Sequence, residues 1–286
     1  MTVEKIPLPA RVGVFGGGRM GAGIAHAFAL AGCEVVVVES DSAAAAAALE
    51  RVTTSLHKAA ERGTLGDSDP AEVTTHVSAT ADVDGLAGVD LVVEAVPEDV
   101  DLKRSVFQRV EQVVPEAVLA TNTSSLSIDA IADGLRSPDR FIGLHFFNPV
   151  PTSDLLEVVV GSRTSAALVD QAQGWAATLG KTAVVVKDSP GFASSRLGVA
   201  IALEAMRMVE EGVASAEDID TAMTLGYRHP IGPLRTTDIV GLDVRLAIAE
   251  HLSRELGPRF EPPQLLRDKV AAGELGRKSG RGFYAW

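Results

Sequence analysis

The stretch Arg11–Ala25, RVGVFGGGRMGAGIA, is a short apolar run that breaks into Gly16, Gly18 and Gly21 and then continues with helical spacing. In a strand–turn–helix unit that binds a dinucleotide, the first glycine permits a tight turn and the second lets a pyrophosphate approach the backbone. The third allows the helix to pack closely on the strand. The phosphates then lie at the helix N-terminus, on amides without partners. The stretch therefore predicts a dinucleotide-binding start.

The next strand pattern, CEVVVVES, ends at Glu39. This position fits the spacing of roughly 20 residues at which an acidic side chain binds the ribose hydroxyls. A carboxylate would face the 2′-phosphate of NADP as a like charge, so NAD is the expected cofactor. Arg19, inside the glycine loop, leaves NADP open, because an arginine there can pair with a phosphate.

Composition describes an ordinary globular protein without a basic footprint. The 286 residues are 46% hydrophobic and 22% charged, with a net charge of −12. Nucleic acid and anionic membrane surfaces are therefore poor partners. The polar, proline-broken N-terminus does not resemble a secretory signal, and no apolar run approaches the roughly 18 residues of a membrane span, so we expect a cytoplasmic protein. The single Cys33 excludes an intramolecular disulfide and a four-cysteine metal site, and we expect no metal.

Strand-like runs alternate with helical patterns in the first two thirds of the chain. They read VGVFG, EVVVVE, DLVVEAV, AVLATN and FIGLHFF, with candidate helices starting near Gly18, Ser42, Asp99 and Ser127. Alternation of this kind predicts a doubly wound, Rossmann-type parallel sheet with helices on both faces. Residues 42–62 read as one long helix, capped by Asp41 or Ser42 and ended by Gly63. With a short helix after it, residues 42–75 form an insertion that projects from the sheet.

The strand pattern continues through LLEVVVG and TAVVVKD and stops after Asp188. Ser189 and Pro190 suit the cap and first position of a helix. Ser215 with Asp218 resembles a capping box that opens another helix. We therefore expect an α/β domain over residues 1–188 and an all-helical domain over residues 189–286. Ligands of such sheets bind beyond the carboxyl ends of the strands, so we expect the site in the cleft that faces the helical domain.

His145 is the best placed of the six histidines to exchange a proton, because GLHFFNP puts it at the end of an apolar strand. Glu157 lies among apolar neighbours in LLEVVV, where an unpaired carboxylate is costly to bury. Pairing would remove that cost, orient the imidazole and suit it to act as a general base. A satisfied core histidine and a solvent-facing glutamate remain the alternative. The other histidines are expected to be structural: His26, His57, His76, His229 and His251.

A second candidate cluster, TNTSSL, follows a strand and precedes a helix. Asn122, Ser124 and Ser125 can reach a ligand from there, or they can cap the helix. These two interpretations stay even. No G-x-S-x-G elbow makes a serine a nucleophile, and no H-E-x-x-H holds zinc.

The chain resembles, over nearly its whole length, the short-chain L-3-hydroxyacyl-CoA dehydrogenases, including the bacterial 3-hydroxybutyryl-CoA dehydrogenases. The motifs that carry the resemblance appear in the same order: GGGRMGAGIA, VVEAVPED, TNTSSL, GLHFFNPV, LLEVV, DSPGF, DIDTAM, HPIGPL, DIVGLD and GRKSGRGFY. The resemblance implies that His145 takes the proton of the 3-hydroxyl while hydride passes from C3 to NAD, and that Glu157 orients His145. It also implies that Ser124 binds the reacting oxygen and that Asn148 helps to order the pair.

The same resemblance implies further binding residues. Met20, Glu98, Lys103 and Asn122 match cofactor-binding positions. Ser55, Lys58 and Arg62, on the predicted projecting helix, match positions that bind CoA, although a solvated helix face would show the same residues. Members of the family are usually homodimers through the helical domain.

One position departs from the family pattern. PGFASSRLG places Ser195 where a substrate-contacting asparagine is expected, and a serine lacks the paired donor and acceptor of an amide. We hypothesise that Ser195 still contacts substrate, and acyl preference stays open. Two other functions also stay open: a dehydrogenase for a free hydroxy acid such as gulonate or carnitine, and a non-catalytic NAD-binding dimer.

Overall fold

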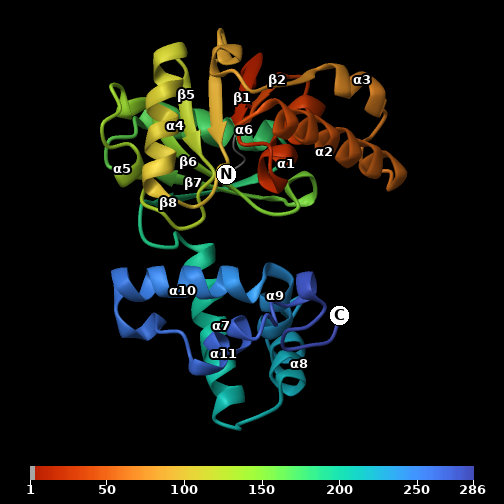
Figure 1. The fold of residues 1–286 in the computed structure, drawn as a ribbon, viewed down its shortest axis with the longest axis vertical. Helices are drawn as coiled ribbons and strands as arrows, with labels where there is room; N and C mark the ends of the chain where they lie inside the picture. Colours follow the sequence, from red (N-terminus) through yellow and green to blue (C-terminus); the bar gives the residue numbers. More distant parts are fainter. Residues whose placement is uncertain (1–3) are drawn as a thin grey trace. The chain divides into compact units, whose positions relative to one another are not determined.

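The computed structural model describes residues 4–286, which divide after Asp188 into two compact units. The first contains an eight-stranded sheet with flanking helices, and the second is helical (Figure 1). The strands are β1 (Arg11–Phe15), β2 (Glu34–Val38), β3 (Val77–Thr80), β4 (Leu91–Glu94), β5 (Val118–Thr121), β6 (Phe141–Phe146), β7 (Leu155–Val160) and β8 (Thr182–Lys187). The helices of the first unit are α1 (Arg19–Leu30), α2 (Ser42–Glu61), α3 (Pro70–Thr75), α4 (Val100–Val113), α5 (Ile128–Ile131) and α6 (Ala166–Thr178). Those of the second are α7 (Ser194–Glu210), α8 (Ala216–Gly226), α9 (Pro233–Val240), α10 (Leu242–Leu256) and α11 (Gln264–Ala271).

The strand order is β3-β2-β1-β4-β5-β6-β7-β8, which confirms the predicted Rossmann-type fold. The order reverses between β1 and β4, the place where such sheets bind ligands beyond their carboxyl ends. Every pair is parallel except β6 with β7. Only residues 147–154 connect these two strands, too few for the helical crossover that a parallel pair needs.

The sheet is covered on both faces, as the alternation of strands and helices predicts. Ile142 and Leu144 of β6 belong to a core shared with α1, α2 and α6. Phe141 points the other way and meets Phe107 of α4 edge to face, with ring centroids 4.8 Å apart. Because successive side chains of a strand face opposite sides, one apolar strand serves both layers.

Local signals account for most of the element ends. Asp41 caps α2 by accepting the Ala44 amide at 2.8 Å, and the chain leaves this helix through Gly63 at φ +67°. Ser215 accepts the Asp218 amide at 3.1 Å at the start of α8, as predicted. The prediction for the first helix of the second unit is wrong. Turns occupy the segment after Ser189, and α7 begins only at Ser194 without a side-chain cap.

A buried carboxylate in the second unit binds the C-terminal segment. Asp238 of α9 accepts hydrogen bonds from the amides of Phe283 and Tyr284 and from the indole of Trp286, at 2.8, 2.9 and 2.8 Å. These bonds hold the C-terminal segment against the helices. Within residues 4–286, none of the helices has the length and apolar character needed to cross a membrane.

Candidate active site

The glycine loop after β1 shows three different reasons for its glycines. Gly16 has φ +96°, a conformation that side chains disfavour. A Cβ at Gly21 would lie 1.7 Å from the Gly16 carbonyl oxygen, so α1 could not pack so closely. Gly18 has an ordinary φ of −63°, and a Cβ there would meet nothing within 4 Å. Neither the backbone conformation nor the packing of the protein therefore requires glycine at position 18. A ligand that lies against the backbone would require it.

Glu39, just beyond β2, lies against this loop. Its carboxylate accepts the Gly17 amide at 2.7 Å and the Ser40 amide at 3.1 Å. Arg51 of α2 holds the other side of the same glycine by donating to the Gly17 carbonyl at 3.1 Å. Gly18, which precedes α1, offers no side-chain cap, so the first amides of this helix lack a capping side chain.

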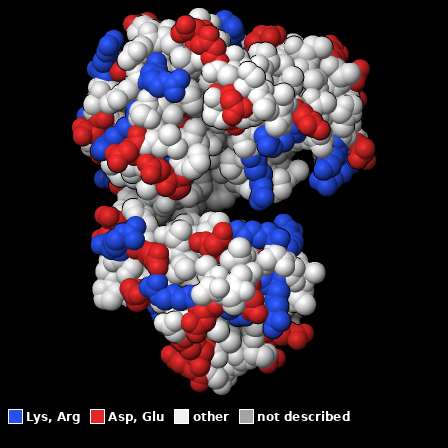
Figure 2. Space-filling model, in the orientation of Figure 1, with Lys and Arg blue, Asp and Glu red and all other residues white. Residues whose placement is uncertain are grey.

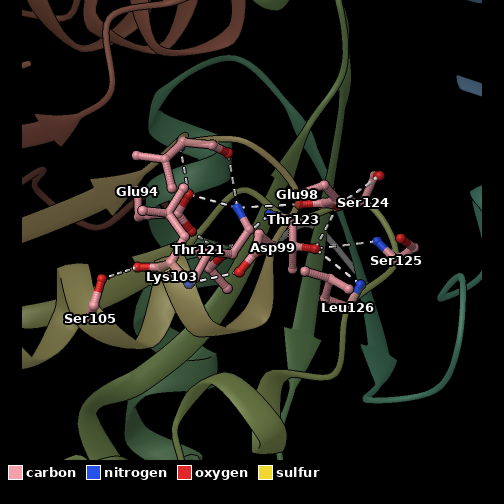
Figure 3. Close-up of polar contacts among 12 residues, drawn as sticks. Glu94, Glu98, Asp99, Lys103, Ser105, Thr121, Thr123, Ser124, Ser125 and Leu126 are labelled. Carbon is pink, nitrogen blue, oxygen red and sulfur yellow. Dashed lines mark hydrogen bonds and ion pairs between the residues drawn. The ribbon is translucent and has the colours of Figure 1, made fainter. Parts of the chain in front are cut away.

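A buried charge network occupies the carboxyl end of β4 (Figure 3). Lys103 of α4 is 1% exposed, and its ammonium lies 2.6 Å from Glu94 and 3.2 Å from Glu98. It also donates to the Val96 carbonyl at 3.2 Å. Glu94 takes a further hydrogen bond from the Thr121 hydroxyl at 2.6 Å. One cation therefore serves two carboxylates.

The two carboxylates respond to this environment in opposite directions. Burial raises the pKa of Glu94 above its usual value, although Lys103 and Thr121 oppose the shift. Burial also acts on Glu98, but the Lys103 ammonium and the donors from Ser124 and Thr123 outweigh it and lower the pKa of Glu98. Glu98 is thus the carboxylate that stays charged to lower pH.

Glu98 fixes the serine loop that follows β5. Its Oε1 atom accepts the Ser124 amide at 2.7 Å, the Thr123 hydroxyl at 2.7 Å and the Ser124 hydroxyl at 3.0 Å. Asn122 ties the same loop to the neighbouring strand, since its Oδ1 atom accepts the Phe146 amide at 2.9 Å. The cap role left open for this cluster belongs instead to Ser127, which accepts the Ala130 amide at 3.1 Å.

His145 and Glu157 are direct cross-strand neighbours, because β6 and β7 run antiparallel and place them opposite each other in the register. His145 Nδ1 lies 2.8 Å from Glu157 Oε2. The two residues are 6% and 1% exposed. The Phe147 ring lies 4.4 Å from the imidazole, centroid to centroid. The carboxylate therefore fixes the ring orientation through Nδ1.

A pocket of about 650 Å³ lies between α1, α2 and the loop after β6. Ser55 and Lys58 of α2 line it together with Arg62, the C-cap residue of this helix, because spacings of three and four residues put the three on one side. Arg19 and Arg51 add two more cations against one carboxylate, Glu50. Figure 2 shows blue atoms gathered at the edge of the first unit near α1 and α2.

The remaining predicted site residues differ in burial and in the unit that carries them. Asn148 is exposed and lines this pocket, whereas His145 and Glu157 are buried. Met20 is half-buried in α1 and packs against the core. Ser195 lies in the first turn of α7, in the second unit. Sequence reasoning missed the roles of Glu94 and Arg51. Glu94 pairs with Lys103 of the following helix, and Arg51 donates to a backbone carbonyl.

The two units of the chain match two domains of one known family. Residues 11–189 match the family model "3-hydroxyacyl-CoA dehydrogenase, NAD binding domain", and residues 191–286 match "3-hydroxyacyl-CoA dehydrogenase, C-terminal domain". The chain belongs to the 3-hydroxyacyl-CoA dehydrogenase family. It is an NAD-dependent oxidoreductase, and the resemblance seen in the sequence is confirmed.

Several relatives cover almost the whole chain. The 3-hydroxybutyryl-CoA dehydrogenase of Mycobacterium tuberculosis is 43% identical over 280 residues, 96% of this chain and 98% of the relative. Among solved structures, FadB2 of M. tuberculosis has a TM-score of 0.94 at 42% identity, with 98% of this chain and 100% of that chain covered. The (S)-3-hydroxybutyryl-CoA dehydrogenase PaaH1 of Ralstonia eutropha has a TM-score of 0.91 at 40% identity, with 98% and 99% covered.

The first unit fits its cofactor, NAD. The open backbone at Gly18 and the uncapped start of α1 suit a pyrophosphate. Glu39 stands beyond β2, where a carboxylate can accept from ribose hydroxyls, and its two backbone donors hold it there.

Proposed function

We propose that the protein oxidises L-3-hydroxyacyl-CoA thioesters of short chain, such as 3-hydroxybutyryl-CoA, to 3-ketoacyl-CoA, with His145 as the general base. The observation that carries the proposal is the buried contact of 2.8 Å between His145 and Glu157 at the end of β6. A protein that only bound NAD would need neither side chain.

The chemistry divides between a hydride and a proton. NAD, when bound, accepts the hydride that leaves C3. His145 Nε2 takes the proton of the 3-hydroxyl, so the C–O bond gains its carbonyl character as the C–H bond breaks. Glu157 accepts the hydrogen bond of the Nδ1 proton and stabilises the imidazolium that forms. In the reverse direction, His145 returns the proton to the alkoxide oxygen.

Ser124 is proposed to bind the reacting oxygen. Glu98 holds its hydroxyl at 3.0 Å, but the same carboxylate atom also accepts the Ser124 amide and the Thr123 hydroxyl. The Ser124 hydroxyl can therefore turn to the substrate without leaving Glu98 unsatisfied. Lys103 is buried among its partners, so we infer that it influences the cofactor through Glu98.

The pocket between α1, α2 and the loop after β6, called the basic pocket below for its cations Arg19, Arg51, Lys58 and Arg62, is proposed to bind the CoA part of the substrate. Ser55, Lys58 and Arg62 supply one hydroxyl and two cations from one helix face, and a CoA nucleotide carries several phosphate charges. Ser195 is proposed to contact the acyl end. Exchange of Ser195 for alanine should lower kcat/KM for at least one acyl chain length, and equal values for every chain length would overturn this role.

We also propose a homodimer through the helical unit. This unit exposes large apolar side chains at Leu197, Ile201, Val213, Leu225, Tyr227 and Ile231. A second copy would remove them from water. Sedimentation velocity should give twice the chain mass, and a monomer at micromolar concentration would refute the dimer.

One substrate panel tests the function. NADH absorbance should fall with acetoacetyl-CoA, more slowly with longer 3-ketoacyl-CoA thioesters, and hardly with free 3-keto acids. A preference for free acids would favour the gulonate or carnitine type of reaction, and no turnover of any substrate would favour a binding protein.

A further inference from the structure

His26 is a buried histidine of α1 that the catalytic pair does not use. It is 1% exposed, and its Nδ1 atom lies 2.8 Å from the Ser55 hydroxyl on α2. Its Nε2 atom is buried and has no partner among the described residues. Both His26 and Ser55 line the basic pocket. The contact therefore links the buried ring of His26 to Ser55 in the wall of the pocket.

The surroundings of His26 decide which ring nitrogen carries the proton. Burial, with the positive charge of Lys181, lowers the pKa of His26 to about 4, so the ring is neutral at physiological pH. A neutral ring carries one proton. On Nε2 that proton would be a buried donor without an acceptor, which proteins avoid more strictly than an unused acceptor. On Nδ1 the proton points at the Ser55 oxygen, so the observed contact places it there.

The Nδ1 proton determines what Ser55 can do. If the Ser55 oxygen accepts from His26, its own proton is left to donate elsewhere. The adjacent pocket wall carries Arg51, Lys58 and Arg62, which can only donate, so a bound group that contacts these cations must accept. We propose that His26 is a positioning residue that makes Ser55 a hydrogen-bond donor to a phosphate group of the CoA part of the substrate. This inference rests on the proposed function.

The test separates the nucleotide part of the substrate from the reacting part. His26→Leu removes the donor, and His26→Asn keeps an amide donor close to the Nδ1 position. His57→Leu is the matched control, because His57 is an exposed histidine of α2, the helix that carries Ser55. Each variant is assayed with acetoacetyl-CoA and with acetoacetyl-pantetheine, which lacks the nucleotide. Calorimetry with CoA alone gives a binding readout that does not depend on turnover.

We expect His26→Leu to raise KM for acetoacetyl-CoA and Kd for CoA about tenfold, the scale for losing one hydrogen bond to a charged group. Its kcat and its KM for the pantetheine thioester should stay as in wild type. His26→Asn should keep both constants within about threefold of wild type, and His57→Leu should change nothing. Ser55→Ala should raise the KM for acetoacetyl-CoA and the Kd for CoA as much as His26→Leu does. The double variant should raise them no further.

Contrary results are equally distinct. If His26→Asn binds CoA as weakly as His26→Leu does, or if KM rises equally for both thioesters, His26 only supports packing and the proposal is wrong. An unchanged CoA affinity in both His26→Leu and Ser55→Ala also overturns it. Should His26→Leu fail to fold, Ser55→Ala and His26→Asn still decide. If wild type turns over no CoA thioester, the proposed function itself fails, which is a different outcome.

Discussion

Lys103→Met should destabilise the first unit strongly, because it leaves the buried carboxylate of Glu94 without its cation. The ammonium and carboxylate are 2.6 Å apart, and the side chains are 1% and 0% exposed. Removing one partner of a pair buried this deeply costs about 3–5 kcal/mol. At about 2–4 °C per kcal/mol for a unit of this size, the melting temperature should fall by roughly 6–20 °C.

The loss should depend on pH in a defined direction. The pKa of Glu94 is raised in the folded protein, which means that the folded state favours the protonated carboxyl. The free energy of unfolding that comes from this shift is present at low pH and is lost as pH rises through the folded pKa. Without the Lys103 ammonium, the pKa of Glu94 rises further, so the variant loses more stability than wild type as pH rises. The pKa of Glu98 is lowered, and the stability that Lys103 gives through it is lost as pH falls. Both effects make the difference between wild type and variant larger at about pH 8 than at about pH 5.

The assay can follow the first unit alone. The chain has two tryptophans, Trp175 in the first unit and Trp286 in the second. In a Trp286→Phe background, thermal unfolding followed by Trp175 fluorescence reports the unit that contains Lys103.

A matched control and a rescue sharpen this test. Lys187→Met, at an exposed lysine of β8, should change stability by less than about 0.5 kcal/mol. Adding Glu94→Gln to Lys103→Met should restore most of the loss. If the melting temperature of Lys103→Met stayed within about 2 °C of wild type at about pH 8, the loss would be about 1 kcal/mol or less, and the reasoning would be refuted.

Three other carboxylates, those of Glu157, Glu39 and Asp238, can each be tested by one substitution. Glu157→Gln should lower kcat by roughly tenfold or more, because the imidazolium loses its charged partner, and NADH affinity measured by fluorescence should not change. Glu39→Ser should shift the ratio of kcat/KM for NADP over NAD upward by about tenfold or more, since a like charge leaves the 2′-phosphate position; a ratio equal to wild type would exclude this role for Glu39. Asp238→Ala should cost about 2–4 kcal/mol by stranding the Phe283 amide and its neighbours, seen as earlier unfolding of Trp286 fluorescence while Trp175 is unaffected.

Sequence patterns were sufficient wherever one local signal dominates. The glycine loop, the apolar runs of β1 and β2 and the Asp41 cap each specify their own conformation. The pattern did not reveal β3, because VSAT is short, lies at the sheet edge and buries only Val77. It also placed the start of α7 too early, since Ser189 and Pro190 suit a turn as well as a helix start.

The candidate site shows the same division. His145 and Glu157 could be expected to pair because a carboxylate among apolar residues needs a partner, and the antiparallel register supplies one. Glu94 is also a carboxylate among apolar residues, but the sequence did not indicate its partner, because the cation comes from the following helix and not from a paired strand. His26 was expected to be purely structural, since its orphaned nitrogen and its serine partner appear only when α1 and α2 pack together.

The most direct measurement compares wild type with His145→Ala in the reduction of acetoacetyl-CoA by NADH, with NADH binding measured in parallel by fluorescence. General acid–base catalysis by His145 predicts that kcat falls by roughly 10²–10⁴ while the Kd for NADH stays within about twofold. A variant that keeps more than about a tenth of the wild-type kcat, with the cofactor still bound, would contradict the assignment of His145 as the proton carrier.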